Sequence, residues 1–594
     1  MISKFRNGTF RRIAAALIAL AAVVSSNLYA PQNASAEAVG PPSGIMRIGL
    51  RYGEFTGATA STGSMESANL QNVTGGGGSG FEFGYYDSLR RFVSVGATTG
   101  ETKITMMRDM NMRYDSGNNM YVNDSANFDV GCYHIQFRNK HSTYASALAA
   151  AESSGIIESF VKYDSGAFYV MSGDFATQSA AASALSSRGY SGSADVNSGT
   201  AETVTVVKTG SGSVLFEFDA RGKAYLAVRP IAEAGSNPTT WFKGYKYYGG
   251  FQYSRPTGYI SVINYVSIDD YAKGVVPYEM GTGWPLEALK AQALCARTYA
   301  ARKVGAHSSS GFDLCTTEHC QVYRGDNNAS DNSNRACDET SGQYITYGGD
   351  LVSTYYSSSD GGATENCENV WNETLPHLKG VEDPYETAVV SKISNYYWTV
   401  SYTPAELTAK LKSRGYTGGT IVSARVTDVT AVGNVYAVEV ADASGYKFTI
   451  QRGDRIRSWL GLSSIRFNIG GNSLIPSAEL FIQGGAGLVA VPKSSELYAD
   501  AGWSSGDALP PGSIYAVDGK GDTVRVGEVN VGDGSADGKI NGKFMFAGAG
   551  NGHSIGMSQW GAYSMASVYN MTAEQIVKFY FTGVQITQVD VYGN

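Results

Sequence analysis

A long helix with a continuous apolar face lies near the middle of the sequence. Pro285 suits a first helical position, and apolar residues recur after it at three- and four-residue spacing: Leu286, Leu289, Ala293, Ala296, Ala300 and Val304. Such a stripe packs against other elements in the core. Before it, residues 258–266 read as a strand, and Asp269 and Asp270 are predicted to cap a short helix that Pro277 closes.

Around this helix the pattern is rich in short strands. Alternation of apolar and polar or small residues predicts strands at 46–53, 81–86, 91–95, 204–207, 214–218 and 224–228. Residues 395–469 combine strands with a helix over 404–414, and residues 478–530 read as short strands and turns. A chain of 594 residues exceeds a single compact core, so several domains are expected. A net charge of −7 leaves no broad basic surface, and we expect no nucleic-acid partner.

The first 36 residues are predicted to be an export signal. Basic residues (Lys4, Arg6, Arg11 and Arg12) precede the apolar run 13–24, and Ala34, Ser35 and Ala36 form a small-residue cleavage site. The alternative is a membrane anchor, but the run is shorter than the roughly 20 residues that span a bilayer. We therefore expect cleavage after Ala36 and a protein that is secreted from the cytoplasm.

Residues 131–196 contain two similar halves. Strand-like residues 133–137 lead into a helix over 142–154, and 167–175 lead into a helix over 177–188. Apolar stripes mark both helices: Ala145, Leu148 and Ala149, then Ala181, Ala184 and Leu185. With a further strand at 156–162 the order is β-α-β-β-α-β. The segment resembles a SPOR domain, a family that binds peptide-stripped glycan strands, although an unrelated ferredoxin-like insert would have the same order.

Glu279 follows the first short helix and precedes the long one, amid Tyr278, Met280 and Trp284. If these side chains exclude water, desolvation raises the carboxyl pKa and lets Glu279 carry a proton near neutrality, as a general acid must. Most glutamates near helix starts are solvated, so this argument is weak by itself.

Four sequence blocks add a resemblance to that argument. In order along the chain they are VSIDDYAKGVVPYEMGTGWPLEALKAQALCARTYAARK, FDLCTTEHCQVYRG, STYYSSSDGGATENCENVW and GHSIGMSQWGAYSMA. They resemble the successive blocks of the SpoIID/LytB family over about 259–584. The resemblance implies a lytic transglycosylase of peptidoglycan whose catalytic glutamate is Glu279. Because the sugar's own 6-hydroxyl attacks the anomeric carbon, one carboxyl can act as acid and then as base. No second acid is obvious, and Asp313, Glu318, Asp360 and Glu365 stay open as candidates.

The same resemblance implies a set of substrate-groove residues: Tyr278, His319, Gln321, Tyr323, Ser357, Ser358, Ser359, Gly361, Gly362, Thr364, His553, Ser558 and Gln559. The hydroxyls and backbone donors around Ser357 suit sugar hydroxyls and acetamido groups. Two positions depart from the family pattern. Asp360 replaces a smaller residue before the paired glycines, and Ser554 replaces the usual glycine.

A compact set of cysteine and histidine residues indicates a metal. Cys315, His319 and Cys320 form a C-x3-H-C pattern that approaches a zinc site, and His307 is the nearest fourth ligand. Similar family members hold zinc at this block, which would be structural and is not required for the chemistry. The alternative is a Cys315 to Cys320 disulfide. Cys337 and Cys367 form another possible disulfide, Cys295 reads as a buried apolar residue, and Cys132 has no evident partner.

These observations predict an α+β, β-rich protein: a signal peptide (1–36), an N-terminal β-rich segment (45–130), a SPOR-like, ferredoxin-like insert (131–196) and a SpoIID/LytB-like catalytic domain (203–594). The expected function is cleavage of peptidoglycan glycan strands to 1,6-anhydro-muramyl ends, and peptide-stripped strands are the expected substrate. Sporulation is implied only by the family. A wall-binding protein that partners a wall amidase, as an amidase enhancer, is the second hypothesis. A zinc amidase or peptidase is the third, since catalytic zinc needs an open position and favours histidine and carboxylates.

Overall fold

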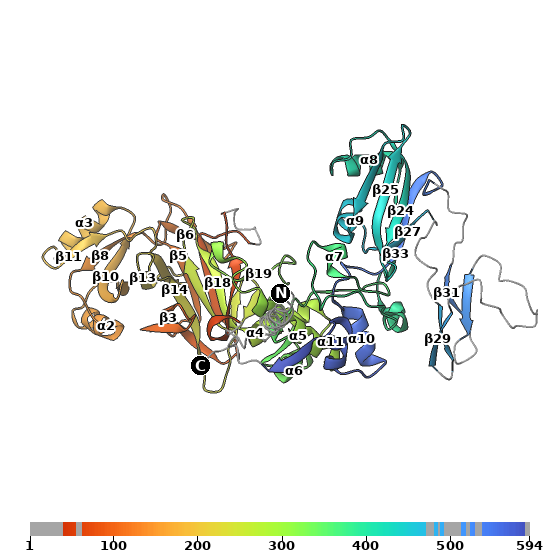
Figure 1. Ribbon diagram of the computed structural model, residues 1–594. Coiled ribbons are helices and arrows are strands. Elements are labelled where there is room, and N and C mark those ends of the chain that lie inside the picture. Colours follow the sequence, from red (N-terminus) through yellow and green to blue (C-terminus); the bar gives the residue numbers. More distant parts are fainter. Residues whose placement is uncertain are drawn as a thin grey trace, which may run out of the picture.

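The computed structural model describes residues 40–54, 62–470 and 537–588, together with the backbone of four strands between 480 and 528. The predicted signal peptide lies outside the described residues. The fold is α+β and rich in strands, as the sequence predicts, with several separate sheets (Figure 1). Within the described residues no helix has the length and apolar character needed to cross a membrane.

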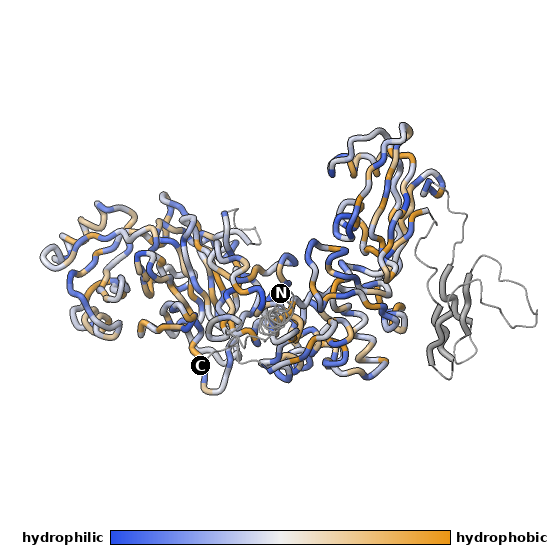
Figure 2. The backbone as a smooth tube through the Cα atoms, in the orientation of Figure 1, coloured by the Kyte–Doolittle hydropathy of each residue, from blue (hydrophilic) through white to orange (hydrophobic). Residues whose placement is uncertain are grey.

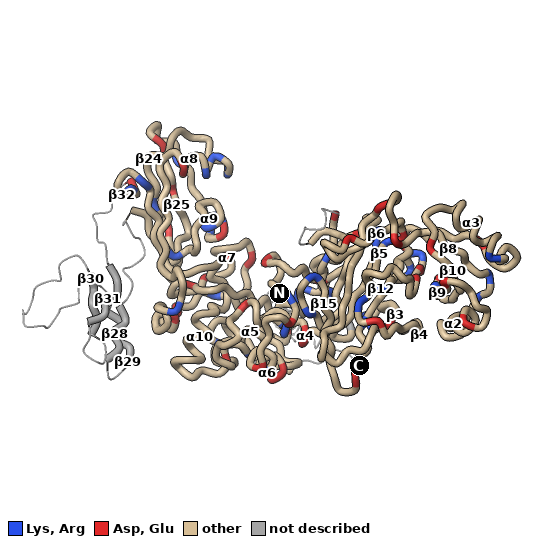
Figure 3. The backbone as a smooth tube through the Cα atoms, turned by 180° about the vertical axis from the view of Figure 1, so that it is seen from behind, with Lys and Arg blue, Asp and Glu red and all other residues tan. Residues whose placement is uncertain are grey.

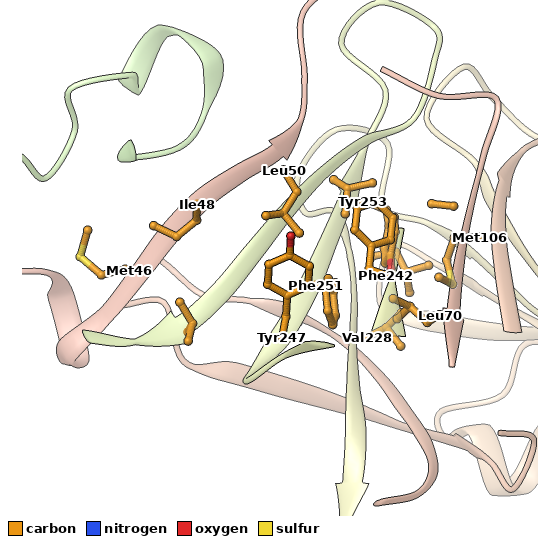
Figure 4. Packing of buried hydrophobic residues seen from close by; sticks show 14 of the residues in the cluster. Met46, Ile48, Leu50, Leu70, Met106, Val228, Phe242, Tyr247, Phe251 and Tyr253 are labelled. Carbon is orange, nitrogen blue, oxygen red and sulfur yellow. The ribbon is translucent and has the colours of Figure 1, made fainter. Parts of the chain in front are cut away.

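A seven-stranded sheet joins the start of the chain to its middle. Strand β1 (Ile45–Arg51) pairs antiparallel with β18 (Ser261–Ser267) and parallel with β19 (Leu314–Cys315). The remaining strands continue in the order β17 (Gly250–Ser254), β14 (Leu226–Ala232), β3 (Gly78–Tyr86) and β4 (Phe92–Thr99). Buried side chains from β1, β14 and β17 meet over this sheet, among them Ile48, Val228 and Phe251 (Figure 4). The N-terminal strand is therefore part of the sheet that supports the central helices.

The segment 131–196 has the predicted β-α-β-β-α-β order. It comprises β8 (Tyr133–Phe137), α2 (Tyr144–Ser153), β9 (Ser159–Asp164), β10 (Ala167–Phe175), α3 (Gln178–Ser187) and β11 (Ala194–Asn197). The strand order is β11-β8-β10-β9, and β9 continues, in parallel, into β13 (Val214–Asp219). The unit thus forms one end of a ten-stranded sheet that goes on through β12 (Val204–Lys208), β5 (Lys103–Arg108), β2 (Ser67–Asn72), β15 (Thr240–Phe242) and β16 (Tyr245–Tyr247).

The predicted apolar face of helix α2 is wrong. Leu148 is 37% exposed, and Ala145 and Ala149 are also exposed, whereas Ala147 and Ala151 are buried against β9 and β10. Alanine lies on several faces of this helix, so spacing alone does not identify the face that the sheet covers. In α3 the prediction is closer, since Ala181 is buried and Ala184 and Leu185 are half-buried.

Helices α4 (Ile268–Glu279) and α5 (Leu286–Arg302) lie at the centre of the molecule, where α5 contacts α4, α6 (Asp331–Glu339), α10 (Gln559–Ser567) and α11 (Ala573–Tyr580). Two predictions about α4 are corrected. The helix continues through Pro277, and its N-cap is Ser267, whose Oγ accepts from the Asp270 N–H. Proline removes one hydrogen bond of the last turns, but only two residues follow it in the helix, so the cost of continuing is limited. Glu279 is therefore the last helical residue.

A separate lobe follows the central helices along the chain. It contains β23 (Tyr397–Tyr402), α8 (Pro404–Lys412), β24 (Ile421–Val429), β25 (Val435–Asp442), β26 (Lys447–Gln451), α9 (Gly453–Leu460), β27 (Arg466–Ile469), β32 (Lys539–Ile540) and β33 (Lys543–Ala549). Its own buried cluster includes Leu407, Val438 and Phe546, and hydrophobic stretches follow its strands (Figure 2). Both Lys and Arg and Asp and Glu are spread over this lobe and over the ten-stranded sheet (Figure 3).

Short elements complete the fold. The strands are β6 (Met112–Asp115), β7 (Met120–Asn123), β20 (Gln343–Tyr347), β21 (Asp350–Leu351), β22 (Tyr356–Ser357), β34 (Met557–Ser558) and β35 (Gln585–Gln588). The helices are α7 (Cys367–Val370) and the 3₁₀ turns η1 (Pro42–Gly44), η2 (Ser308–Ser310) and η3 (Glu386–Lys392). Two hairpins, β28 (Leu480–Gly484) with β29 (Gly487–Val491) and β30 (Ser513–Val517) with β31 (Thr523–Glu528), fall in the predicted strand-and-turn region.

Candidate active site

Glu279 projects from the C-terminal end of α4 into a groove of about 540 Å³. Its Oε1 accepts a hydrogen bond from the Val322 N–H at 3.2 Å, and the side chains of Tyr356 and Gln559 lie within hydrogen-bonding reach of its carboxyl group. Desolvation nevertheless dominates, and it raises the pKa of Glu279 above its ordinary value. The exposed carboxylate of Glu318 adds to the rise, because a nearby negative charge disfavours ionisation.

The groove brings all four sequence blocks together. Strand β22 pairs in parallel with β34, Tyr356 opposite Met557 and Ser357 opposite Ser558. Gly552 lies against Ser357, where a Cβ would come within 2.4 Å of the serine Cβ, so a side chain at this position is excluded. Ser554, in place of the family's usual glycine, adopts a left-handed conformation with φ of 60°. These contacts place His553 and Gln559 beside Glu279 in one groove.

Seven of the predicted substrate-binding residues line this groove: Tyr278, His319, Gln321, Ser357, Ser358, His553 and Gln559. Tyr356 is held by a hydrogen bond from its hydroxyl to Gln321 Oε1 at 3.0 Å. Burial lowers the pKa of His553 to about 4, so its ring is neutral at pH 7, and its Nδ1 accepts from the Ile555 N–H at 3.0 Å. The ring nitrogen Nε2 is then the protonated one.

The other six lie outside the groove and are corrected. Tyr323 is buried, and its hydroxyl donates to Asn264 Oδ1 at 2.7 Å. Ser359 and Ser558 are buried hydroxyls that donate to Glu386. Thr364 pairs with the backbone of Val381. Gly361 and Gly362 have positive φ and form the turn that follows. The sequence alone does not distinguish these six residues from their neighbours that line the groove. In the structure they lie outside the groove and support its wall.

Behind this wall lie three buried carboxyl groups. One oxygen each of Asp360, Asp383 and Glu386 lies within 4.8 Å of the others. Glu386 accepts hydrogen bonds from Ser359 Oγ, Ser558 Oγ and the N–H groups of Asp360 and Gly361. Burial, followed by repulsion from neighbouring carboxylates, raises the pKa of Glu386 to about 7 and that of Asp360 well above its ordinary range. Burial and the neighbouring carboxylates thus favour the protonated form of Asp360.

The other acids that the sequence left open fall into two groups. Asp313 is fully buried and forms ion pairs with Arg47 at 3.0 Å and Arg90 at 2.6 Å. Glu365 is buried and accepts from Thr430 Oγ1 at 2.6 Å and Asn434 Nδ2 at 3.0 Å. Of the four candidates only Glu318 lines the groove with Glu279. Asp313, Asp360 and Glu365 are thus structural.

The predicted metal ligands converge. One ligand atom each from His307, Cys315, His319 and Cys320 lies within 4.8 Å of all the others. His307 Nε2 is 3.3 Å from Cys320 Sγ, and His319 Nδ1 is 3.6 Å from Cys320 Sγ and 3.8 Å from Cys315 Sγ. Tetrahedral zinc with its usual bond lengths would separate N and S ligands by about 3.6 Å. The four side chains therefore fit a zinc ion.

The sequence leaves a metal site and disulfides as alternatives for the cysteines. All six cysteines are free, so neither the Cys315 to Cys320 disulfide nor the Cys337 to Cys367 disulfide is formed. The hydrogen bond between the two thiols lowers the pKa of Cys315 to about 3 and raises that of Cys320, because Cys320 donates and Cys315 accepts. Cys315 ends β19, next to Gly49 of β1, where a Cβ would meet the Phe312 ring at 2.7 Å. Cys295 is buried, as the sequence predicts.

Several groove residues were not predicted: Tyr299, Val322, Tyr355, Tyr356, Trp371, Arg457, Asn551 and Gly552. Arg457 comes from α9, in the lobe where the sequence indicates no chemistry. It is half-buried and is the only Lys or Arg among the residues that line the groove. No sequence signal marks it, because the lobe reaches the groove only through tertiary packing. The Trp371 ring packs at a tilt of 53° against the ring of His553, with centroids 4.9 Å apart.

Comparisons with known proteins agree with the sequence blocks. Residues 257–347 match the family model SpoIID, described as "Stage II sporulation protein". This part of the chain therefore resembles the SpoIID family. The match covers α4, α5 and the Cys/His quartet, and so includes Glu279.

Each of three relatives matches more than half of the chain. An uncharacterised protein of Brachyspira hyodysenteriae is 28% identical over 59% of this chain and 77% of its own length. "Stage II sporulation protein D" of Bacillus subtilis is 26% identical over 55% of this chain and 77% of its own length. "Amidase enhancer" of the same organism is 28% identical over 53% of this chain and 40% of its own length. The family is accordingly linked to sporulation and to the cell wall.

Proposed function

We propose that this protein is a lytic transglycosylase that cleaves peptidoglycan glycan strands to 1,6-anhydro-muramyl ends. The observation that carries the proposal is the carboxyl group of Glu279, desolvated at the end of α4 and open to a groove of about 540 Å³. A carboxyl with a raised pKa holds a proton near neutrality and can donate it to a leaving glycosidic oxygen.

The chemistry needs one acid/base. Protonated Glu279 gives its proton to the bridging oxygen as the glycosidic bond breaks. The carboxylate formed then takes the proton of the muramyl 6-hydroxyl, whose oxygen closes onto the anomeric carbon. No water is consumed and Glu279 regains its proton, so the second carboxylate of ordinary glycosidases is unnecessary. The Val322 N–H, at 3.2 Å from Oε1, stabilises the carboxylate between the two steps.

The groove side chains suit a glycan. Aromatic rings of Tyr278, Tyr355 and Trp371 offer apolar faces to sugar rings, and Ser357, Ser358 and Asn551 offer hydrogen bonds. The Arg457 guanidinium would attract an anionic group such as the lactyl carboxylate of muramic acid, which is free when the stem peptide has been removed. Peptide-stripped strands are accordingly the proposed substrate.

We assign the remaining parts as follows. Residues 1–36 would be a signal peptide, cleaved after Ala36, and the protein would act outside the membrane in the cell wall. Residues 131–196, with the strand order β11-β8-β10-β9, would be a SPOR-like glycan-binding module inserted between the N-terminal segment (45–130) and the catalytic domain (203–594). Sporulation is the proposed context, as in the B. subtilis relative that is named for it.

A structural zinc ion is the proposed occupant of His307, Cys315, His319 and Cys320. Zinc would hold the segment 307–320 against β1 and so position His319 and Gln321 along the groove, while the proton transfers remain with Glu279. Metal analysis tests this: Cys315→Ser/Cys320→Ser should lose one zinc per chain relative to the wild type, whereas Cys132→Ser should not. An unchanged zinc content in the double variant would refute the assignment.

A second function is favoured by one relative, the protein named "Amidase enhancer". In that case the groove would bind glycan strands without cutting them, and the partner would be a wall amidase. A zinc amidase ranks third, because two thiolates and two imidazoles leave no open position for water.

Product analysis separates these functions. Purified glycan strands, with and without stem peptides, are incubated with the protein and examined by mass spectrometry. We expect products with 1,6-anhydro ends from stripped strands. Hydrolytic ends or released peptides would contradict the proposal, and strand binding without any product, together with stimulation of an added amidase, would support the second function.

A further inference from the structure

A buried group of polar side chains lies where the β-α-β-β-α-β unit meets the rest of the ten-stranded sheet. Asp109 follows β5, His134 lies on β8 and Glu217 lies on β13. One ligand atom from each lies within 4.8 Å of the other two. His134 and Glu217 are fully buried and Asp109 is 9% exposed. Nothing in the proposed reaction uses these residues, and they are remote from Glu279 in the sequence.

The hydrogen bonds of this cluster are incomplete. His134 Nδ1 lies 2.7 Å from the Gly173 carbonyl oxygen, and because a carbonyl only accepts, Nδ1 carries the hydrogen. His134 Nε2 faces Glu217 Oε1 at 3.4 Å and Asp109 Oδ1 at 3.9 Å, longer than the usual N–H···O range. Neither oxygen of Glu217 has a hydrogen-bond partner among the described residues. Buried polar groups rarely lack hydrogen-bond partners, and where they do, a bound ion or water is the common explanation.

The neighbouring cations compensate only part of the negative charge. Lys162 Nζ lies 3.3 Å from Glu217 Oε2, which leaves Oε1 free on the side of His134. Arg255, close to Asp109, directs its guanidinium to the carbonyl oxygens of Thr203 and Gly258. Apart from His134 itself, no cation among the described residues faces the space between His134 Nε2, Glu217 Oε1 and the Asp109 carboxylate.

The spacing fits a metal ion. With usual zinc bond lengths, tetrahedral N and O ligands stand about 3.3–3.5 Å apart, which matches the His134 to Glu217 separation and requires only a small shift of Asp109. A histidine that donates from one nitrogen to a backbone carbonyl while the other faces carboxylates has the arrangement typical of metal-bound histidine.

We propose that Asp109, His134 and Glu217 form a buried zinc site that fastens the β-α-β-β-α-β unit to the body of the protein. The three ligands come from the unit (β8), from the strand next to it (β13) and from the loop after β5, so one ion ties all three together. The ion fixes the orientation of the unit relative to the sheet. This inference is independent of the proposed catalytic function and of the Cys/His quartet.

Metal analysis of the full chain tests the site. In a Cys315→Ser/Cys320→Ser background, which lacks the other quartet, protein equilibrated with zinc and desalted should retain one zinc per chain. Adding His134→Gln should reduce this to none, while His141→Gln, a half-buried histidine of the same unit, should leave it unchanged. No retained zinc in the background protein, or zinc that survives His134→Gln, would overturn the proposal.

Unfolding gives a second measurement if the His134 variant is poorly folded. In the same cysteine background, zinc should raise the unfolding temperature relative to a chelator, because a ligand that binds only the folded state stabilises it. Glu217→Gln should remove most of that shift. An unfolding temperature that is the same with zinc and with chelator would show instead that His134 is an imidazolium ion paired with the two carboxylates.

Discussion

Replacement of Glu279 by glutamine removes the proton that the proposed reaction moves while leaving most of the surroundings intact. The amide oxygen can still accept the Val322 N–H hydrogen bond that Glu279 Oε1 accepts at 3.2 Å. Glutamine also has nearly the same volume and avoids the desolvation cost that raises the pKa of Glu279. We therefore expect the unfolding temperature to stay the same or to rise slightly.

The expected loss of activity follows from the double role of this carboxyl. General acid–base catalysis contributes roughly 10²–10⁴-fold. Because Glu279 would serve as acid in one step and as base in the next, the loss should lie in the upper part of that range, about 10³-fold or more. This corresponds to about 4 kcal/mol at ~1.36 kcal/mol per factor of ten. Binding of glycan strands should change little, since the groove keeps its other side chains.

The assay is the rate of appearance of 1,6-anhydro ends from peptide-stripped strands, with strand binding measured separately. Glu287→Gln is the matched control: Glu287 lies on α5, where its Oε2 accepts from the Ala573 N–H at 2.7 Å, and it does not line the groove. A Glu279→Gln protein that stays folded and keeps more than a tenth of wild-type activity would refute the reasoning. So would an equal loss in a folded Glu287→Gln protein.

Three further predictions concern the groove and its wall. Glu318→Gln removes a negative charge that raises the pKa of Glu279, so the alkaline limb of the pH–rate profile should move to lower pH; an unmoved limb would mean that Glu279 is not the acid. Arg457→Gln should raise KM for peptide-stripped strands roughly tenfold, about 1.4 kcal/mol for a lost charge-assisted hydrogen bond, with little change in kcat, whereas the exposed Arg455→Gln should not. Asp360→Asn mimics the protonated acid. The pKa of these buried carboxyls is raised, to about 7 for Glu386, so the free energy of unfolding of the wild type falls as pH rises from the unfolded pKa to the folded one. Asp360→Asn should therefore unfold at a higher temperature than wild type at pH 8 and at a similar temperature at pH 4. Equal unfolding temperatures of the two proteins at both pH values would contradict this.

Local patterns in the sequence predicted much of the fold and of the site. The apolar spacing after Pro285 predicted α5, and alternation predicted β1 and the strands of the β-α-β-β-α-β segment. The C-x3-H-C spacing, with His307, predicted a quartet that does converge. The ordered blocks led to Glu279, which lies in a groove as expected. These features could be predicted because each depends on residues that are neighbours along the chain.

Tertiary packing decided the rest. Arg457 reaches the groove from a separate lobe, and Tyr323, Ser359 and Ser558 turn inward although their neighbours face the groove. Asp313 has a structural role because it forms ion pairs with Arg47 and Arg90, which are distant in the sequence. Exposure and charge pairing depend on which distant segments pack together, and no spacing within one segment encodes that. The sequence by itself indicated the family resemblance and Glu279 as the candidate acid, because both depend on residues close together in the chain. The tertiary structure determined which neighbouring side chains line the groove, because that depends on how distant segments pack.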